Sequence, residues 1–475
     1  MPALIAAAPL LAVIALIASR RLGVLPSGLI GWALAVAAAA WLQPAGTGII
    51  GFTVGESLKG AWIAWQAIAV TVAGLFFYRA IGRVVAGPGA VEGFSHRQLW
   101  AICFLIGPFT ESATGFGVGC VIALSALFRM GLGGVPAVAL ALYSQILVPW
   151  GALAVGTLVG AGLIGLGETE LALASAYLTA PLLAGYLLLY WRFARKAGHP
   201  VPTRQKLDDA AWTLLLAAAL IIATREVAAE LGCIASAGTL IVVRYLRDRR
   251  PDAAAFAGTA RLVAPYAVLS LTLIATRTMP PLTHALKSML VLAPYDGLPS
   301  FALLYNPCLW LIGTALVFLI AEGRAGLLGT HLRETALAAW RPVLVTLLFL
   351  AMTQILTAAG GAQLIGTALK AALGPETLLA APVLGAVGGF LTGSNVSAAG
   401  MMMSVQAAMG TGAVLWPATL QNVAASNFSL LSPIRVAMGA ALSGMAEEAV
   451  YKAIWPIGAM LLLLLVAEAA FLLFL

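Results

Sequence analysis

Residues 107–117 read GPFTESATGFG and decide the fold, because they set one carboxylate, three hydroxyls and three glycines inside an otherwise apolar stretch. Two short apolar runs flank this segment within residues 98–129. Irregular backbone at membrane depth is tolerated only where protein buries it or where it lines a cavity. The segment therefore predicts a re-entrant hairpin. An ordinary span whose glycines serve close helix packing is the alternative.

The composition places the whole chain in a membrane. Of its 475 residues, 62% are hydrophobic and 9% are charged, whereas soluble proteins are about 45–50% apolar and roughly 25% charged. So few charges cannot cover a water-facing surface, so we expect an all-α polytopic membrane protein with about 12 transmembrane helices. The net charge of +8 would suggest nucleic acid in a soluble protein. Here basic residues in short loops set the orientation, and no nucleic-acid partner is expected.

A second interrupted segment occurs at residues 379–410. Residues 388–397 within it read GGFLTGSNVS, and this motif can be aligned with residues 107–117. Further on, Gln145 and Gln421 occupy corresponding places in two later spans. Interrupted hydrophobic segments at corresponding positions of two halves point to the binding site of a secondary transporter.

Loop charges predict how the two halves are arranged. Basic clusters at 192–206 and 244–261 flank a helix pair and so lie on one face, which we place in the cytoplasm. The first hairpin then opens inward and the second opens outward. We expect two inverted-topology repeats, 1–209 and 246–475, linked by the helix pair 210–245. Each repeat has three spans, a hairpin (98–129 or 379–410), a broken span and a last span, with both termini outside.

Glu111 is the residue most suited to proton coupling. A charged side chain at membrane depth costs about 3 kcal/mol on insertion scales, and desolvation favours the neutral form of a carboxyl group. We therefore expect Glu111 to exchange protons. A structural role is the alternative, because a carboxylate at the N-terminus of a half-helix is favoured by the helix dipole.

The two hairpins and the two broken spans supply the candidate substrate-binding residues. These side chains offer hydroxyls, amides and one guanidinium to a small anion: Thr110, Ser112, Thr114, Gln145, Thr392, Ser394, Asn395, Ser397, Gln421, Asn422 and Arg435. For the second hairpin, a set of helix caps is the alternative. Arg435 suits either pairing with a carboxylate or the end of its span. Arg277, Glu322 and Glu468 lie near span ends, where we expect their side chains to reach the interface.

Enzyme chemistry finds no support in the sequence. Intramembrane proteolysis needs a GxSxG-type serine or a pair of intramembrane aspartates, and all five aspartates fall in expected loops. The four cysteines and four histidines are scattered without metal-ligand spacing. We therefore expect no enzyme activity, no metal and no cofactor.

Three motifs resemble the lactate permease family. Residues 107–117 are similar to that family's glycine-rich stretch with a central Glu. Residues 391–397 resemble its Thr-Gly-Ser-Asp-Thr-Ser stretch, and Leu431-Ser432-Pro433 its late Ser-Pro segment. Two departures leave the substrate and the coupling ion open: Asn395 stands where the family has an acid, and Ser429 where it has a Lys. The resemblance also implies kinship with the ion-transporter superfamily, whose members often move a substrate-carrying domain like an elevator.

The resemblance implies proton-coupled symport of small 2-hydroxymonocarboxylates, such as lactate or glycolate, into a bacterium. The expected location is the plasma (inner) membrane, and the expected partners are the carboxylate anion, protons and the lipid bilayer. A sodium-coupled organic-anion transporter is one alternative, and an anion channel is an alternative of a different class. The sequence leaves open rocking or elevator motion, and a monomer or a homodimer.

Overall fold

A computed structural model describes residues 1–19, 21–43, 48–81, 93–410 and 414–474. Among the described residues, its first half contains helices and connecting turns without strands, and several short helices lie in its middle. The elements are α1 (Pro2–Ala18), α2 (Val24–Leu42), α3 (Ile49–Ile81), α4 (His96–Ala101), a π-helical turn (Ile102–Ile106), α5 (Gly107–Thr114), α6 (Val118–Arg129), α7 (Gly134–Ala141), two 3-10 turns (Leu142–Gln145 and Val148–Trp150), α8 (Gly151–Ile164), α9 (Glu168–Lys196), α10 (Thr203–Glu226), a 3-10 turn (Ala229–Leu231) and α11 (Gly232–Arg249).

The second half is also mainly helical and contains one small antiparallel strand pair. The elements are α12 (Ala253–Thr278), α13 (Pro280–Ser288), β1 (Val291–Leu292), β2 (Phe301–Ala302), α14 (Pro307–Ala321), a 3-10 turn (Ala325–Leu327), α15 (Leu328–Ala358), α16 (Gly361–Leu373), a 3-10 turn (Gly374–Leu379), α17 (Ala380–Thr392), α18 (Asn395–Met409), α19 (Leu415–Phe428), a 3-10 turn (Ser429–Leu431), α20 (Pro433–Ser443) and α21 (Glu447–Leu472).

The long apolar helices confirm an all-α polytopic membrane protein. Nine helical stretches among the described residues are long and apolar enough to cross a membrane, or ten if the bent pair Gly134–Gln145 and Val148–Ile164 is one span. The sequence predicted about twelve. The counts differ because α1 and α14 have only 17 and 15 residues and α19 is followed by a break. The stretch Gly361–Thr392, counted among the nine, includes the first arm of the expected second hairpin.

Both interrupted segments are helix–break–helix structures. In the first, α5 and α6 are separated by three residues with positive φ, Gly115, Phe116 and Gly117, and the two helices pack against each other. In the second, α17 ends at Gly393 in the left-handed conformation and α18 begins after Ser394. Glycine is the usual residue where φ must be positive, because it has no Cβ. We call residues 115–117 and 393–394 tip 1 and tip 2.

Each hairpin is followed by a broken helix. After the first, α7 and α8 meet at a bend of 52°, and three consecutive residues of α8, Ala152, Leu153 and Ala154, have left-handed backbone. After the second, α19 is separated from α20 by a 3-10 turn and by Ser432, which is extended. These breaks lie where Pro149 and Pro433 remove a backbone N–H donor.

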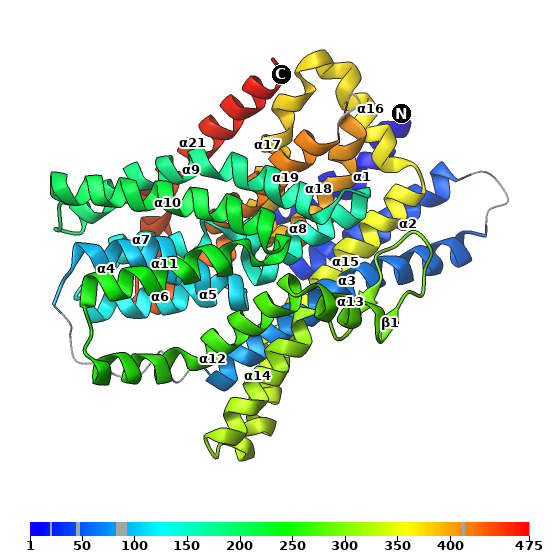
Figure 1. The fold of residues 1–475 in the computed structure, drawn as a ribbon. Coiled ribbons are helices and arrows are strands. Elements are labelled where there is room, and N and C mark those ends of the chain that lie inside the picture. The colour runs from blue at the N-terminus through cyan, green and yellow to red at the C-terminus, as the bar shows by residue number, and fades with distance from the viewer. Residues whose placement is uncertain (20, 44–47, 82–92, 411–413, 475) are drawn as a thin grey trace.

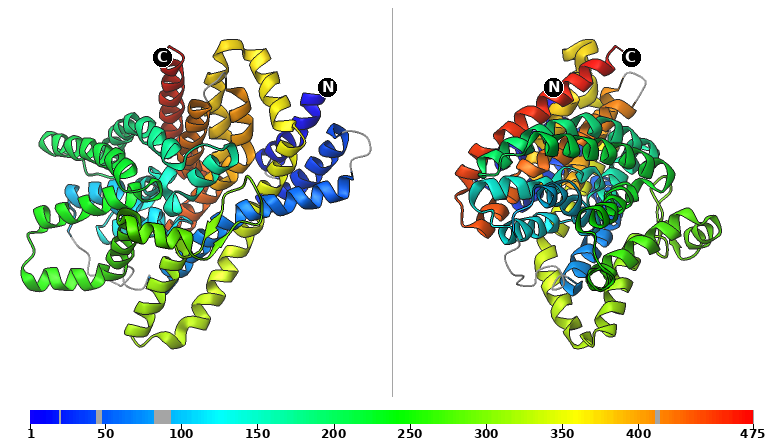
Figure 2. Two further views of the ribbon diagram at one scale, coloured as in Figure 1. Left: turned by 45° about the vertical axis from the view of Figure 1, so that its right-hand side comes forward. Right: turned by 60° about the vertical axis from the view of Figure 1, so that its left-hand side comes forward.

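The views show where the two ends of the molecule lie. In Figure 1, the loop after α9, the loop after α11 and the turn between α14 and α15 lie toward the left and the bottom. The N-terminus and β1 lie toward the right. Met1 and the end of α21 are both near the top in every view (Figures 1 and 2). The three basic connections thus lie away from the N-terminus in the view of Figure 1.

Glycines allow the helices around the hairpins to approach closely. A Cβ on Gly60 of α3 would lie 2.6 Å from the Ala351 Cα of α15, and one on Gly389 of α17 would lie 2.0 Å from the Ala425 carbonyl oxygen of α19. A Cβ on Gly119 would lie 2.5 Å from the Gly107 carbonyl oxygen in the other arm of the first hairpin. The small residues predicted for ordinary helix packing are therefore present, together with the broken backbone.

Candidate functional site

Glu111 lies in the middle of α5 and caps the next helix, α6, within its own hairpin. Its side chain is 3% exposed. Oε1 accepts a hydrogen bond from the Gly117 N–H at 2.9 Å, and Oε2 accepts one from the Gly119 N–H at 3.0 Å. These N–H groups belong to the N-terminus of α6, where the first donors of a helix have no partner within the helix and the dipole favours negative charge. The capping role that the sequence left open is therefore present.

Arg435 approaches the same carboxylate from the other half of the chain. Its Nη2 lies 3.5 Å from Glu111 Oε1. The first turn of α20 holds this side chain in place: Ser432 accepts the Arg435 N–H at 3.3 Å, and Pro433 occupies the first helical position. Both are favoured residues at a helix start. Of the two roles considered for Arg435, pairing with a carboxylate is the one that the structure contains.

The first turn of α20 contacts both hairpin tips. A Cβ on Gly117 in tip 1 would lie 2.1 Å from Arg435 Nη1, and a Cβ on Gly393 in tip 2 would lie 2.8 Å from Ser432 Oγ. One helical turn, from Ser432 to Arg435, therefore connects the two interrupted segments that the sequence identified separately. On the other side, α8 performs a similar role, since Gly115 packs against Ala152 and Gly156 packs against Asn395.

The hydroxyls of the first hairpin are bonded to backbone carbonyls. Thr110 Oγ1 donates to the Ile106 and Gly107 carbonyls at 2.8 and 2.9 Å, and Thr114 Oγ1 donates to the Thr110 carbonyl at 2.6 Å. Ser112 Oγ donates to the Trp150 carbonyl at 2.8 Å. The sequence expected these groups to contact a carboxylate or a substrate. In helices, Ser and Thr commonly donate to carbonyls three or four residues earlier, as Thr110 and Thr114 do here, whereas Ser112 donates to a carbonyl of the following broken helix.

The hydroxyls of the second hairpin shape tip 2. Thr392 Oγ1 donates to the Gly388 carbonyl at 2.8 Å, and Ser394 Oγ caps α18 by accepting the Ser397 N–H at 3.3 Å. Ser397 itself is 1% exposed. Ser394 therefore has the capping role that was the alternative to substrate binding. Asn395 instead bonds to Asn422, outside its own hairpin.

Asn395 joins a network that crosses between the halves. Its Nδ2 donates to Asn422 Oδ1 at 2.8 Å, and Asn422 Nδ2 donates to Thr157 Oγ1 and to Ser175 Oγ, both at 2.9 Å. Thr157 lies in α8 and Ser175 in α9, so four helices meet at these side chains. Sequence reasoning identified Asn395 and Asn422 and missed Thr157 and Ser175. No local pattern marks these two residues, because their partners are over two hundred residues away.

The two glutamines occupy different surroundings. Gln421 Oε1 accepts from Gln406 Nε2 at 2.9 Å, deep between α18 and α19. Gln145 Nε2 donates to Ser144 Oγ at 3.0 Å, and its Oε1 is buried without a hydrogen-bond partner among the described residues. The structure therefore does not place Gln145 and Gln421 at equivalent contacts, although the repeat aligned them.

Arg277 differs from the expectation for a residue at a span end. It is 8% exposed, its Nε donates to Glu230 Oε1 at 3.0 Å, and its Nη2 donates to the Tyr305 carbonyl at 2.8 Å. Its guanidinium also lies 4.2 Å from the centre of the Tyr305 ring, and burial raises the pKa of Tyr305 to about 12. The prediction that the Arg277 side chain extends to the membrane interface was wrong, because Glu230 and the Tyr305 carbonyl bind it in the protein interior.

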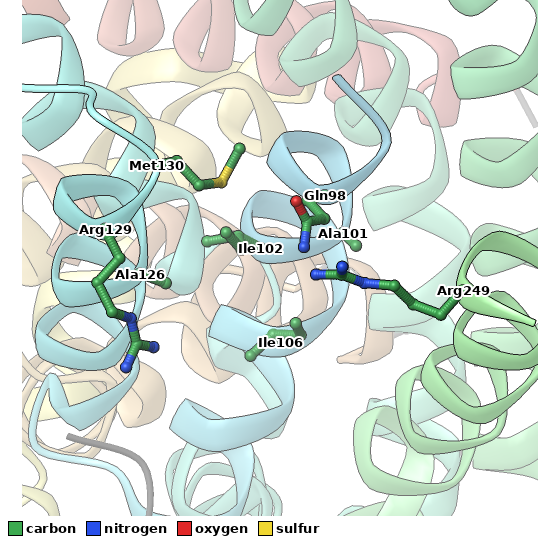
Figure 3. Close-up of a pocket in the computed structure, with 8 residues that line it drawn as sticks. All are labelled: Gln98, Ala101, Ile102, Ile106, Ala126, Arg129, Met130 and Arg249. Atoms are coloured by element: carbon green, nitrogen blue, oxygen red, sulfur yellow. The ribbon is translucent and has the colours of Figure 1, made fainter. Parts of the chain in front are cut away.

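A cavity of about 230 Å³ opens at the other end of the first hairpin (Figure 3). It lies between the start of α4 and the end of α6, with Arg129 and Arg249 on opposite sides of Ile102 and Ile106 in the view. Tip 1 lies at the opposite end of α6, and Glu111 does not line this cavity. The candidate site is the buried cluster at the two tips. Groups of three or more possible metal-ligating residues do not occur within the described ranges.

Comparisons with known proteins find a similarity over the second half of the chain. No curated protein matches the chain. The family model described as L-lactate permease matches residues 276–474, which include tip 2, Asn422 and Arg435, whereas Glu111 precedes the matched region. The resemblance is thereby confirmed for the motifs at 391–397 and 431–433, which lie in the matched region. Over residues 276–474 the chain is similar to the L-lactate permease family, whose name denotes transport of lactate across a membrane.

Proposed function

We propose that the protein is a secondary active transporter that carries protons together with small 2-hydroxymonocarboxylates, such as lactate and glycolate, across the plasma membrane of a bacterium. The observation that supports this proposal is the pair formed by Glu111 and Arg435 at the junction of the two hairpin tips. It sets a protonatable group and an anion-binding group in direct contact. A proton-coupled carrier of anions needs both.

In the structure, three donors surround the carboxyl group of Glu111. Two backbone N–H groups and one guanidinium contact its oxygens, and each of these contacts stabilises negative charge. Protonation of Glu111 becomes favourable when another anion occupies Arg435. A substrate carboxylate is such an anion, and Arg binds carboxylates with a planar set of donors.

When the substrate carboxylate replaces the Glu111 carboxylate at Arg435, substrate binding becomes coupled to proton binding. Arg435 Nε is buried without a partner among the described residues, so the guanidinium has a donor to offer. When the substrate anion binds there, an ionised Glu111 would repel it by about 4 kcal/mol at 4 Å and an effective dielectric of about 20. Protonation of Glu111 removes that repulsion. Proton and anion therefore bind together and leave together.

The order of the elements supports two repeats of inverted topology. In the first half, α3 is followed by a hairpin, the broken pair α7–α8 and the long helix α9. In the second, α15 is followed by a hairpin, the broken pair α19–α20 and the long helix α21, with α16 added before the hairpin. We infer that 1–209 and 246–475 are the repeats and that α10 and α11 link them. In such transporters the substrate lies at the repeat interface.

Uptake into vesicles against imposed gradients tests the proposal. Accumulation of labelled lactate driven by an inward proton gradient, in the absence of sodium, is the expected result. Accumulation that needs a sodium gradient would replace this proposal with the sodium-coupled alternative. Flux that equilibrates lactate without ever concentrating it would instead identify an anion channel.

A further inference from the structure

In the hydrogen-bond network of Asn395, the direction of donation is fixed by the two hydroxyls farthest from it, those of Thr157 and Ser175. Thr157 Oγ1 lies 2.6 Å from the Pro149 carbonyl oxygen, and Ser175 Oγ lies 2.7 Å from the Leu171 carbonyl oxygen. A hydroxyl has one hydrogen to donate, and a carbonyl can only accept. Each hydroxyl therefore gives its hydrogen to the backbone and can only accept from other partners. Thr157 Oγ1 also lies 3.2 Å from Asn422 Oδ1, but the shorter contact takes the hydrogen.

The orientation of Asn422 follows from these two hydroxyls. Both need a donor, and the Nδ2 group of Asn422 carries two hydrogens at 2.9 Å from each of them. The Oδ1 of Asn422 must then face the other way, toward Asn395. A carbonyl oxygen requires a donor opposite it, so Asn395 presents its Nδ2 there, at 2.8 Å. The amide orientations in this chain are thus set by chemistry, with no freedom to reverse.

Asn395 Oδ1 is the end of the network. It is buried and has no hydrogen-bond partner among the described residues, and the whole residue is 6% exposed. It lies at the first position of α18, directly after tip 2, with Gly156 of α8 packed against its side chain. An acceptor buried without a donor destabilises the state that contains it. The structure therefore holds an oxygen that is ready for a donor brought by something else.

We propose that Asn395 Oδ1 accepts a hydrogen bond from the 2-hydroxyl of the transported acid and so selects hydroxy acids. This inference rests on the proposed function and adds the group by which the substrate is recognised. Lactate and glycolate carry a hydroxyl donor beside the carboxylate. Propionate and acetate lack it, and pyruvate has an acceptor in its place. A small cation fits this position less well, because cations require several oxygen ligands and the neighbouring hydroxyls are already occupied by Asn422.

Competition for lactate uptake tests the inference in the unmodified protein. In vesicles that take up labelled L-lactate, unlabelled glycolate should compete about tenfold or more better than acetate, and lactate better than propionate by a similar factor, since a site built for a hydroxyl discriminates against analogues that lack it. Equal competition by propionate and lactate would overturn the inference and leave the proposed function standing. Vesicles that accumulate none of these acids would contradict the proposed function instead.

Two variants make the assignment specific. Asn395→Ala should bring the ratio of lactate to propionate uptake close to one, because its effect falls on the hydroxy acid. Asn427→Ala is the matched control: this buried amide on α19 has both ends paired, to the Tyr186 hydroxyl and to the Val423 carbonyl, each at 2.8 Å. It should keep the wild-type ratio. If Asn395→Ala lowers uptake of both acids equally, or removes a dependence on sodium, Asn395 does not recognise the hydroxyl.

Discussion

Replacing Glu111 with Gln should separate substrate binding from proton coupling. Gln has nearly the shape of Glu and keeps one oxygen that can accept from the Gly117 or the Gly119 N–H. It has no charge, and it cannot gain or lose a proton. The variant therefore resembles the protonated state of Glu111 permanently. We expect it to bind and exchange lactate but to lose accumulation driven by a pH gradient.

The geometry of the pair gives the size of the effect. At 3.5 Å and an effective dielectric of about 20, the two unit charges attract by on the order of 5 kcal/mol. Removing one partner of a buried pair usually costs about 3–5 kcal/mol, because the other charge is left uncompensated. A bound substrate anion restores part of that compensation. Because about 1.4 kcal/mol corresponds to a tenfold change in affinity, Glu111→Gln should tighten lactate binding about tenfold or more.

Two measurements in proteoliposomes separate the possible outcomes. Exchange of labelled for unlabelled lactate reports binding and movement of the loaded site, and accumulation under an inward proton gradient reports coupling. Glu468→Gln is the matched control, because Glu468 is also a carboxylate in a spanning helix and its two oxygens are buried without partners among the described residues. It should keep both activities. If Glu111→Gln still concentrates lactate in response to the proton gradient, Glu111 is not the coupling site.

Three further predictions follow from other parts of the molecule. Arg435→Lys should abolish exchange as well as accumulation, because a lysine cannot offer the planar donor set; normal exchange by this variant would exclude Arg435 from substrate binding. A cysteine at His199 should resist an impermeant thiol reagent applied to intact cells, because its loop is basic and lies on the expected cytoplasmic side; the four native cysteines are buried, and labelling from outside would show that the topology is wrong. Burial lowers the pKa of His96, with a smaller contribution from the charge of His199, so the unfolded chain takes up a proton near pH 6.5 that the folded protein resists. Stability in detergent should therefore fall as the pH drops through that value, and His96→Asn should reduce the fall in melting temperature; an unchanged pH profile would contradict this.

The sequence predicted the interrupted segments well because their signal is local. Hydroxyls and glycines clustered inside an apolar stretch are unusual, and residues 107–117 and 388–397 do contain the two tips. The capping of α6 by Glu111 could also be anticipated, since its partners lie six and eight residues further on. Local spacing was enough for these features.

The contacts between the halves could not be predicted in the same way. Glu111 meets Arg435, and Asn422 meets Thr157, across more than two hundred residues. Only the packing of the helices determines these pairs. The hydroxyls of Thr110 and Thr114 point into their own helix because the nearest carbonyl competes with any ligand. Residue type alone indicated a polar site, but it could not indicate which hydroxyls already donate their hydrogen to a backbone carbonyl.

The left-handed turn at Ala152–Ala154 makes the two broken helices unequal as mechanical elements. Each non-glycine residue in this conformation costs about 1–2 kcal/mol, so the three residues of α8 together hold about 3–6 kcal/mol of backbone strain. The break before α20 holds none of this kind, because Ser432 is extended and Pro433 begins an ordinary helix. The broken helix of the first half is thus strained where it packs against Gly115 of tip 1, and the broken helix of the second half is not strained in this way. Any movement that returns α8 to a right-handed turn recovers that energy, whereas a bend at α20 recovers nothing. In a transport cycle, a step that straightens α8 would release this strain and the return step would restore it, whereas the break before α20 would contribute nothing in either direction.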